Sequence, residues 1–436
     1  MSRIAVIGSG ISGLSAAWHL TQADHAHQIT VFEAGSHFGG HANTVDVTLD
    51  GVTHGVDTGF LVYNERTYPG LIQLFETLNV ACAPSDMSFS VQSPRKGRAQ
   101  DHLEWSGSSL NTVFAQRRNL LSPRFWSMLK DIVRFNSLTT SLAQRGEDVA
   151  LRQPIGEFLD QHQFSEAFKE DYFLPMVACI WSCPTEQMLR FPMATMIRFC
   201  HNHGLLQVAN RPQWFTVKGG SREYVRKVLQ HLPDTRLNTP VTSLTRLSDE
   251  VIVHTPNGNE RFDGVVLACH SDQALRLLGH QASPQESRLL GAIRYQPNRA
   301  VLHTDETLLP KRRMAWAAWN YERAVNSGSH DAPVCLHYLI NRLQPLPWQR
   351  SVIVSLNPLR EPRTDQVIQT IEYDHPVFDQ AAIDAQRTLH TIQGLQRTWY
   401  AGAWCGYGFH EDGFQAGLRA AQDLNATLQA AVRQAA

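Results

Sequence analysis

A glycine-rich segment near the start of the chain has residue types and spacing that suit the binding of phosphate groups. It reads Gly8-Ser9-Gly10-Ile11-Ser12-Gly13, a GxGxxG pattern. The first glycine of such a pattern permits a tight turn, the second lets the main chain approach a pyrophosphate, and the third lets a helix pack closely on a strand. Free N–H groups and the positive end of the helix dipole would then hold the phosphates.

One carboxylate completes this pattern. Glu33 follows Gly13 by twenty residues, the spacing at which an acidic side chain accepts hydrogen bonds from ribose hydroxyls and repels a 2′-phosphate. Because a glycine pattern alone recurs by chance, a plain glycine turn is the alternative interpretation. The glycines and Glu33 together predict a dinucleotide-binding site.

Three short elements must position these groups. Ile4 to Gly8 is an apolar run ended by glycine, Ile11 to Leu20 has helical spacing of apolar and small residues, and Ile29 to Phe32 is a second apolar run. Runs of this kind indicate buried parallel strands joined by a crossover helix. We also expect strands at Phe262–Ala268 and Thr398–Gly402 and a final helix from Gly413 to Ala431.

Four later segments match a known family in the right order. They are Gly39-Gly40-His41, Asp57-Thr58-Gly59, Lys218-Gly219-Gly220-Ser221 followed by Pro240-Val241, and Tyr400-Ala401-Gly402 through Glu411-Asp412-Gly413-Phe414. Together they resemble the FAD-dependent amine oxidase superfamily. The resemblance implies an α/β fold, with a Rossmann-type FAD-binding domain of the amine oxidase/glutathione reductase-like kind and a second substrate domain of mixed sheet plus helices.

The resemblance also implies FAD as the cofactor. A second GxGxxG, which would suit a nicotinamide cofactor, is absent from the sequence. His41 departs from the family because it stands where members carry an arginine, so a permanent charge becomes a titratable one. The residues expected to bind FAD are Gly8, Gly10, Ile11, Ser12, Gly13, Glu33, Ala34, Gly39, Gly40, His41, Gly59, Val241, Gly402, Gly413 and Phe414.

The segment before the final helix holds the candidates for chemistry, although no catalytic base can be named. Cys405 is interpreted as a flavin attachment point, a reactive thiol or a packed small residue, and His410 as a proton shuttle or a packed side chain. Tyr407 is the third candidate. By resemblance, main-chain N–H groups near Gly413 and Phe414 face the pyrimidine end of the flavin.

Metal binding and hydrolysis have little support. Cys179 with Cys183, and Cys200 with His203, have spacings that a helix produces by chance and do not form a neat tetrad of ligands. We therefore expect no metal. No Ser-His-Asp set stands out, so hydrolysis is not expected.

A closer resemblance concerns the substrate. Segments 173–184, 198–206, 316–321 and 338–344 resemble uncharacterised bacterial flavoproteins related to the flavin-binding N-terminal region of plant cyclopropane fatty acid synthases. This implies desaturation or double-bond isomerisation of fatty acyl chains. An amine oxidase is the alternative enzyme, and a non-catalytic lipid-binding carrier is the alternative of another class. The intact glycines and Glu33 disfavour the carrier.

Length and composition set the broad expectations. With 436 residues and a formal net charge of −1, we expect two or three lobes and no nucleic-acid partner. The scattered cysteines and the lack of a long apolar run predict a cytoplasmic protein. Residues 1–60, 206–275 and 395–436 are expected to form the FAD-binding domain, and 61–205 and 276–394 the substrate domain with a helical cap.

One amphipathic segment raises a question of membrane contact. In Pro123–Phe135 apolar residues recur at helical spacing, and Arg117, Arg118, Arg124, Lys130 and Arg134 lie outside that stripe. The region 117–135 could meet an anionic membrane surface. Packing of the same stripe in the core is the alternative, and the oligomeric state is not predicted.

Overall fold

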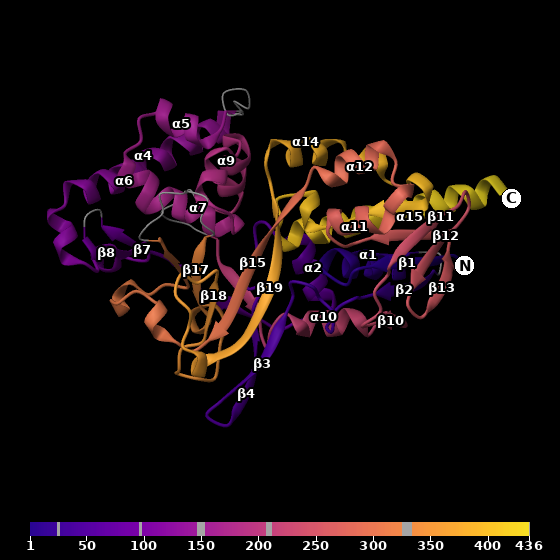
Figure 1. The fold of residues 1–436 in the computed structure, drawn as a ribbon, viewed down its shortest axis with the longest axis horizontal. Coiled ribbons are helices and arrows are strands. Elements are labelled where there is room, and N and C mark those ends of the chain that lie inside the picture. Colours follow the sequence, from indigo (N-terminus) through magenta and orange to yellow (C-terminus); the bar gives the residue numbers. More distant parts are fainter. Residues whose placement is uncertain (24–26, 96–97, 146–152, 206–211, 325–333, 436) are drawn as a thin grey trace.

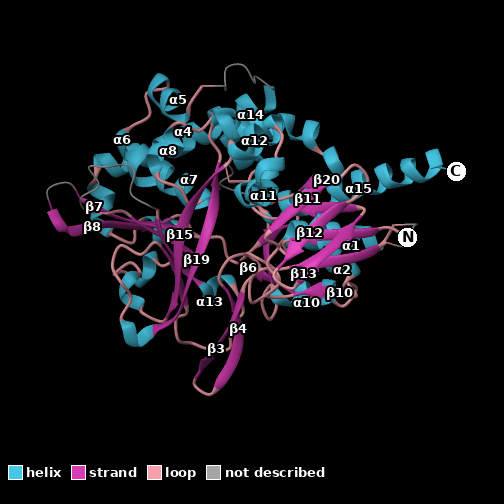
Figure 2. Ribbon diagram, turned by 45° about the vertical axis from the view of Figure 1, so that its right-hand side comes forward, coloured by secondary structure: helices cyan, strands magenta, loops and turns pink. Residues whose placement is uncertain are grey.

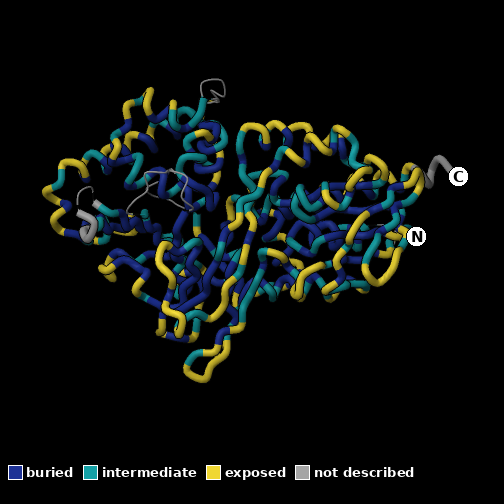
Figure 3. Tube along the Cα trace, in the orientation of Figure 1, coloured by how far each residue is buried: buried dark blue, intermediate teal, exposed yellow. Residues whose placement is uncertain are grey.

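The computed structural model describes residues 1–436 except 24–26, 96–97, 146–152, 206–211, 325–333 and 436. Figure 1 shows two lobes, one of which contains both termini, with the long strands β15 and β19 lying between them. Figure 3 shows that buried residues follow the sheets of both lobes, while exposed residues lie on the outer turns and helices. Helices and mixed sheets thus give the α/β class that the sequence predicts.

The lobe with the termini is built on a parallel sheet of order β10-β2-β1-β14-β20. Its strands are β10 (Asp234–Arg236), β2 (Gln28–Phe32), β1 (Arg3–Ile7), β14 (Gly264–Leu267) and β20 (Thr398–Tyr400). The register pairs Ile7 with both Phe32 and Leu267, and Leu267 with Tyr400. The carboxyl ends of four strands are therefore level, and the residues that follow them meet at one edge.

Both faces of this sheet are covered. Ile4 and Val6 are fully buried in a core shared with α1 (Ile11–Thr21) and α15 (His410–Ala435). Ala5 and Ile7 face a second core. That core is formed with β11 (Ser243–Arg246), β12 (Val251–Thr255), β13 (Gly258–Phe262), α11 (Ser271–Leu278), α12 (Pro284–Gly291) and α14 (Gln380–Thr388). Successive side chains of β1 thus point alternately into the two cores, as the pleat of a strand requires.

The strands of the parallel sheet come from three separate stretches of the chain, as the sequence suggests. The helices α12 and α14 lie inside the range 276–394 that was expected to belong to the substrate domain, yet their buried residues pack with the parallel sheet. The nucleotide-binding lobe therefore includes more of the chain than the sequence pattern indicates.

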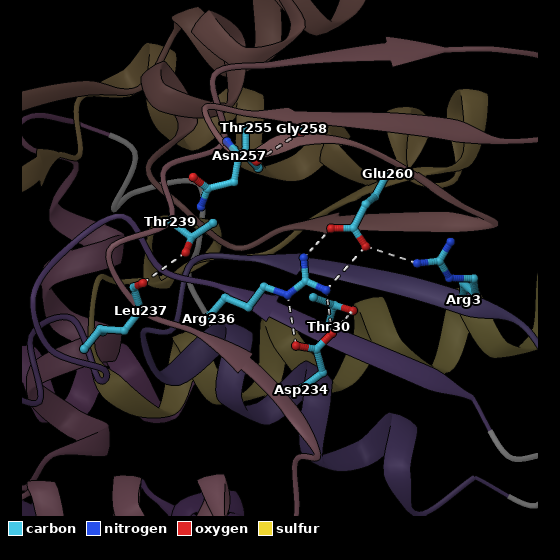
Figure 4. Close-up of polar contacts among 10 residues, drawn as sticks. All are labelled: Arg3, Thr30, Asp234, Arg236, Leu237, Thr239, Thr255, Asn257, Gly258 and Glu260. Carbon is cyan, nitrogen blue, oxygen red and sulfur yellow. Dashed lines mark hydrogen bonds and ion pairs between the residues drawn. The ribbon is translucent and has the colours of Figure 1, made fainter.

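Charged side chains hold the edge strand β10 in place (Figure 4). Arg236 donates to Asp234 of its own strand, with 2.8 Å between Nη2 and Oδ2, and to Glu260 of β13, which also pairs with Arg3 at 3.2 Å. Thr30 of β2 donates to the same Asp234 at 2.9 Å. This network fixes the segment after β10 beside Glu33.

The second lobe contains a seven-stranded sheet of order β19-β15-β18-β17-β16-β7-β8. All neighbours are antiparallel except β16 and β7. The bounds are β19 (Val367–Val377), β15 (Arg294–His303), β18 (Ile353–Leu356), β17 (Cys335–Leu339), β16 (Trp319–Glu322), β7 (Phe89–Arg95) and β8 (Arg98–Ser106). Figure 2 shows the hairpin of β3 (Thr44–Leu49) and β4 (Val52–Asp57) projecting below it.

Small strands and a helical cap complete this lobe. A three-stranded sheet joins β5 (Tyr63–Asn64), β9 (Trp214–Val217) and β6 (Cys82–Ser85). The helices of this lobe are α3 (Leu110–Val113), α4 (Pro123–Arg145), α5 (Ile155–Gln161), α6 (Glu166–Phe168), α7 (Leu174–Trp181), α8 (Thr185–Leu189), α9 (Met193–Asn202) and α13 (Ile340–Leu343). Two further helices, α2 (Pro69–Thr77) and α10 (Arg222–Leu229), pack on α15 and α1 in the lobe with the termini. Within the described residues, no helix has the length and apolar character that crossing a bilayer requires.

The apolar stripe of α4 is divided between core and surface. Phe125, Met128 and Phe135 are buried, and Leu129 and Ile132 pack against the same core. Trp126 and Val133, by contrast, are 49% and 63% exposed. Core packing thus accounts for most of the stripe.

Candidate functional site

The glycine-rich turn between β1 and α1 has a separate role for each glycine. Gly8 has φ +102°, and a Cβ there would lie 2.7 Å from the carbonyl oxygen of Ala268. A Cβ on Gly13 would overlap the carbonyl oxygen of Gly8. At Gly10 a Cβ would meet nothing within 4 Å. Gly8 and Gly13 are therefore needed for packing, and Gly10 presents bare main chain on an open side.

The first turn of α1 is suited to hold an anion. Gly10 is its N-cap and offers no side chain to the first N–H groups of the helix. Ile11 and Ser12 are buried in the same turn. Amides at a helix start that lack a side-chain acceptor can bind phosphate oxygens.

Glu33 lies directly beside this turn. Its Oε2 accepts hydrogen bonds from the N–H and hydroxyl of Ser9 at 3.0 and 2.5 Å, and its Oε1 accepts from the N–H of Gly35 at 2.8 Å. Each carboxylate oxygen keeps further acceptor capacity for ribose hydroxyls. The exposed Ala34 follows it, and Thr239 donates to the Glu33 carbonyl at 2.8 Å, which places the chain leading to Val241 nearby.

The second glycine pair folds onto the first. The N–H of Gly39 donates to the Ser9 carbonyl at 3.1 Å, and a Cβ on Gly40 would lie 3.2 Å from the Cα of Gly10. A Cβ on Gly59 would overlap the carbonyl oxygen of His41. These close approaches bring segments 8–13, 39–41 and 57–60 together, as the sequence predicts.

His41 belongs to a cluster of rings that the sequence pattern does not reveal. Its imidazole stacks on Tyr373 with 4.8 Å between ring centroids, and His375 and His270 follow at 5.4 and 6.5 Å. Its Nε2 is buried and has no hydrogen-bond partner. A buried donor or acceptor without a partner is costly, so this nitrogen is available to an anionic group at the site.

The cluster is uncharged in the protein alone. Burial, reinforced by His375 and His270, holds the pKa of His41 well below 6.5. Burial also lowers the pKa of His270, and it lowers that of His375 to about 4. His270 follows β14 directly, so the rule that sites form at the carboxyl ends of parallel strands could have identified it. His375 and Tyr373 lie on β19, and no sequence signal points to them.

The motifs Asp57-Thr58-Gly59 and Lys218-Gly219-Gly220-Ser221 are joined by hydrogen bonds. The fully buried Asp57 accepts from the N–H and hydroxyl of Ser221, both at 2.8 Å, and from the Gln344 amide, also at 2.8 Å. Burial raises the pKa of Asp57 to about 6. Asp57 thus links three segments far apart in sequence and supports the loop that carries Gly59.

The C-terminal segment packs tightly against the glycine-rich turn. A Cβ on Gly413 would lie 2.7 Å from Cγ2 of Ile11, and Gly402 is extended with φ 174°. The Gly413 N–H donates to the Phe409 carbonyl at 3.1 Å, and the Phe414 side chain is buried. The Gly413 N–H therefore bonds within the first turn of α15. Its expected contact with the flavin remains a prediction.

The three candidate catalytic residues, Cys405, Tyr407 and His410, are all packed against other side chains. Burial raises the pKa of the Cys405 thiol to about 12, so it is no reactive thiolate near neutral pH. Burial raises the pKa of Tyr407, whose ring lies 6.0 Å from that of Phe199. His410 is stacked on Phe60 at 3.7 Å, and burial lowers its pKa to about 3. A neutral, packed His410 does not suit a proton shuttle.

The two carboxylates of this segment accept hydrogen bonds from main-chain N–H groups at the starts of helices. Glu411 accepts from the N–H groups of Gly70 and Leu71 at the start of α2, at 2.9 and 3.0 Å. Asp412 accepts from the N–H of Phe409 at 2.9 Å. Burial raises the pKa of Asp412 to about 6. Capping accounts for both.

An aromatic cluster joins the C-terminal segment to the helical cap. Phe199 of α9 stacks on His203 at 3.9 Å and on Phe409 at 4.7 Å. Trp214 and Tyr68 each lie 6.3 Å from His203. Burial lowers the pKa of His203 to about 4, so this histidine is neutral near pH 7. The junction is therefore aromatic, with the cations Arg66 and Arg198 near its edge.

The cysteines considered as metal ligands are packed in the core. Cys183 and Cys200 contact Met188 and Met196 at 3.0 and 3.5 Å, and burial raises the pKa of each thiol to about 12. Within the described residues, one other group has the composition of a metal site: Glu322, Cys335 and His337.

Hydrogen-bond directions account for that group without a metal. The Asp305 N–H donates to Nδ1 of His303 at 3.0 Å, which assigns the ring proton to Nε2. That Nε2 bonds the Ser355 hydroxyl at 2.7 Å, and this hydroxyl bonds Nδ1 of His337 at 2.6 Å. Nε2 of His337 then donates to Glu322 at 3.1 Å. A metal bound through Nε2 of His337 would have to displace that proton. The expected absence of a metal remains a prediction.

Comparison with known proteins identifies the family. The model of the family described as flavin containing amine oxidoreductase matches residues 11–328. The chain belongs to this family and is an FAD-dependent oxidoreductase, which confirms the expected cofactor, enzyme class and superfamily resemblance. The residues around the glycine turn, Glu33 and His41 fit FAD. No curated protein matches the sequence.

Solved structures share the fold at low sequence identity. The CLA-producing fatty acid isomerase from P. acnes has a TM-score of 0.67 and 16% identity, with 97% of this chain and 98% of that chain covered. Cyclohexylamine oxidase from Brevibacterium oxydans IH-35A has a TM-score of 0.68 and 14% identity, with 98% and 99% covered. Putrescine oxidase bound to putrescine has a TM-score of 0.65 and 15% identity, with the same coverage. These similarities confirm the predicted fold class.

Proposed function

We propose that this enzyme dehydrogenates or isomerises the fatty acyl chain of an apolar lipid. The observation that carries the proposal is the character of the junction between the C-terminal segment and the helical cap. Its rings are aromatic, its histidines are neutral, and the two carboxylates of the segment are committed to helix ends. An uncharged apolar chain suits such surroundings.

The chain's own residues would bind and orient substrate there and exclude water. His203 and His410 stay neutral near pH 7 because burial lowers their pKa values, so neither adds a charge that an apolar chain would have to desolvate. FAD would supply the hydride acceptor there. Net desaturation would release the second hydrogen as a proton to water and would need oxygen or a quinone as the final oxidant, whereas isomerisation would be redox-neutral.

An amine substrate is the second candidate because the family and two similar structures include amine oxidases. An amine that arrives as an ammonium ion gains from a carboxylate at the site. Along residues 403–413, all of which the structure describes, Glu411 and Asp412 are the acidic side chains, and both are engaged. This engagement favours the acyl chain over the amine.

Anaerobic mixing of the FAD-loaded protein with each substrate class tests the proposal. We expect unsaturated or saturated fatty acids to bleach the flavin absorbance, or to emerge with a shifted double bond, while primary amines leave the spectrum unchanged. Bleaching by amines alone would replace the acyl proposal with amine oxidation. A protein that binds acyl chains tightly yet converts none, with FAD bound, would identify a carrier instead.

A further inference from the structure

Exposed apolar side chains follow one another on α3, on the 3₁₀ turn after it and at the start of α4, in the helical lobe. We define the apolar tip as Leu110, Leu120, Leu121 and Trp126, which are 81%, 46%, 88% and 49% exposed. They come from α3, from the 3₁₀ turn η1 (Arg117–Leu121) and from the start of α4. Large aliphatic side chains this exposed are unusual when several occur together.

The apolar tip is held firmly by its own main chain. The indole N–H of Trp126 donates to the Leu120 carbonyl at 2.9 Å, and its ring packs 5.4 Å from the buried ring of Phe114. The Arg117 guanidinium donates to the Phe114 carbonyl at 3.0 Å and to the Asn111 side chain. The Trp126 indole and the Arg117 guanidinium thus bond to groups of the same segment, which fixes its conformation while the apolar side chains stay exposed.

Neighbouring elements extend the same surface. Met314, 43% exposed, lies on the 3₁₀ turn η5 (Arg313–Ala315), which packs against α3. Val133, 63% exposed, lies two helical turns beyond Trp126 on α4 and therefore on the same face, with the exposed Lys130 between them.

The charge around the apolar tip is positive. Lys130 and Lys311 are exposed and form no ion pair with the described residues, and Arg117 bonds neutral oxygens. The nearby acids are already engaged, since Glu104 is buried beneath Arg312 at 3.0 Å and Asp171 is paired with Arg124 at 2.9 Å. Uncompensated lysine and arginine thus surround the leucines and tryptophan.

We propose that the apolar tip docks the protein on a lipid bilayer that contains anionic headgroups. Leucine and tryptophan side chains would enter the boundary between headgroups and acyl chains, and the basic side chains would remain among the phosphates. A bilayer suits side chains that each protrude separately, whereas a protein partner requires a continuous, closely packed area. This docking is independent of the substrate, because it rests on residues remote from the glycine-rich turn.

Vesicle sedimentation with the full-length FAD-loaded protein tests this docking. We expect binding to phosphatidylcholine vesicles that contain phosphatidylglycerol, and weaker binding to pure phosphatidylcholine. Replacing Leu110 and Leu121 together by serine should weaken binding at least about tenfold. Leu247→Ser removes a leucine that is 40% exposed in the other lobe and should change nothing.

The charge variant separates lipid from other partners. Lys130→Gln should weaken binding to the anionic vesicles about fivefold and leave the weak binding to neutral vesicles unchanged. Unaltered melting temperatures of the variants would show that the fold is intact. Equal vesicle binding by the double leucine variant and the wild type, or no binding by either, overturns the proposal. A dimer that Leu121→Ser dissociates, without vesicle binding, would identify a second copy as the occupant instead.

Discussion

The phenol of Tyr224 and the imidazole of His410 form a hydrogen bond of 2.8 Å between the Tyr224 oxygen and Nε2. Both residues are buried, and His410 also stacks on Phe60. The pair ties α10 to the first turn of α15, next to the glycine-rich turn. The bond therefore positions the start of the last helix and does not expose His410 for proton transfer.

Replacing His410 tests this positioning role. His410→Ala should lower the free energy of unfolding by about 1–3 kcal/mol, because the buried Tyr224 hydroxyl loses its partner, while His410→Gln, which can still bond, should cost less. Urea denaturation of the FAD-loaded proteins measures the difference. The pH profile of turnover should be the same in wild type and His410→Gln, and a profile that loses one limb would restore His410 as a proton shuttle.

Glu33 is expected to contribute strongly to FAD affinity. Glu33→Ala removes a charged acceptor for ribose hydroxyls, a contact worth about 1.5–3 kcal/mol, so FAD should bind roughly tenfold to hundredfold more weakly. Titration of apoprotein with FAD, followed by flavin fluorescence, gives the dissociation constant. Glu76→Ala on α2 is the matched control for an exposed glutamate. Equal affinities of Glu33→Ala and wild type would remove Glu33 from the cofactor site.

The histidine cluster should couple FAD binding to pH. The pKa of His41 lies well below 6.5 in the protein alone, and a nearby pyrophosphate would raise it, so binding takes up protons. The dissociation constant should therefore fall as the pH falls below about 6.5 and stay nearly constant above it. His41→Arg carries a fixed charge and should flatten this dependence. Identical profiles in calorimetric titrations would place His41 away from the phosphates.

The sequence predicted the glycine-rich turn and Glu33 better than it predicted the histidine cluster around His41. Gly8, Gly13 and Glu33 belong to a local βαβ unit, in which spacing alone determines the geometry. His270 could have been placed at this edge because it follows a parallel strand. His375 reaches His41 only through tertiary contact between segments more than 300 residues apart, and no local pattern carries that information. The bonds of Asp57 to Ser221 and Gln344 are likewise tertiary. The three segments were each recognised in the sequence, but their contact was not.

Asp57 should make stability depend on pH in the acid range. Its pKa is about 6 in the folded protein and about 4 in an unfolded chain, so between these values the folded state retains a proton that the unfolded state has lost. The free energy of unfolding should therefore decrease by roughly 2–3 kcal/mol as the pH rises from about 4 to about 6. Asp57→Asn should lack this component. Urea denaturation at a series of pH values would contradict the prediction if both slopes agreed.

Adjacent aromatic residues on α4 should differ sharply in their effect on stability. Phe125 is 3% exposed, so Phe125→Ala should cost about 3–5 kcal/mol. Trp126 is 49% exposed, and Trp126→Ala should cost only about 1 kcal/mol, chiefly the lost bond to Leu120. Chemical denaturation of the two variants compares them directly. Similar losses would mean that Trp126 belongs to the core.

The division of α4 could not be read from its sequence. Phe125 and Trp126 are neighbours, and helical spacing alone does not indicate which of the two is buried. That depends on which side of α4 the later segments cover. The chain after α4 supplies Phe164, Phe168 and Phe173, which lie around Phe135. The helix was therefore predictable, while the part of its stripe that remains outside was not.

The placement of β20 has a consequence for biosynthesis. This strand, residues 398–400, pairs with β14, and α15 lies along α1. About 390 residues separate the glycine-rich turn from this strand, so during translation the turn waits some tens of seconds for its neighbours at ordinary elongation rates of about 5–20 residues per second. Until then the first βαβ unit has exposed apolar faces, and FAD capture should follow the synthesis of β20 and α15.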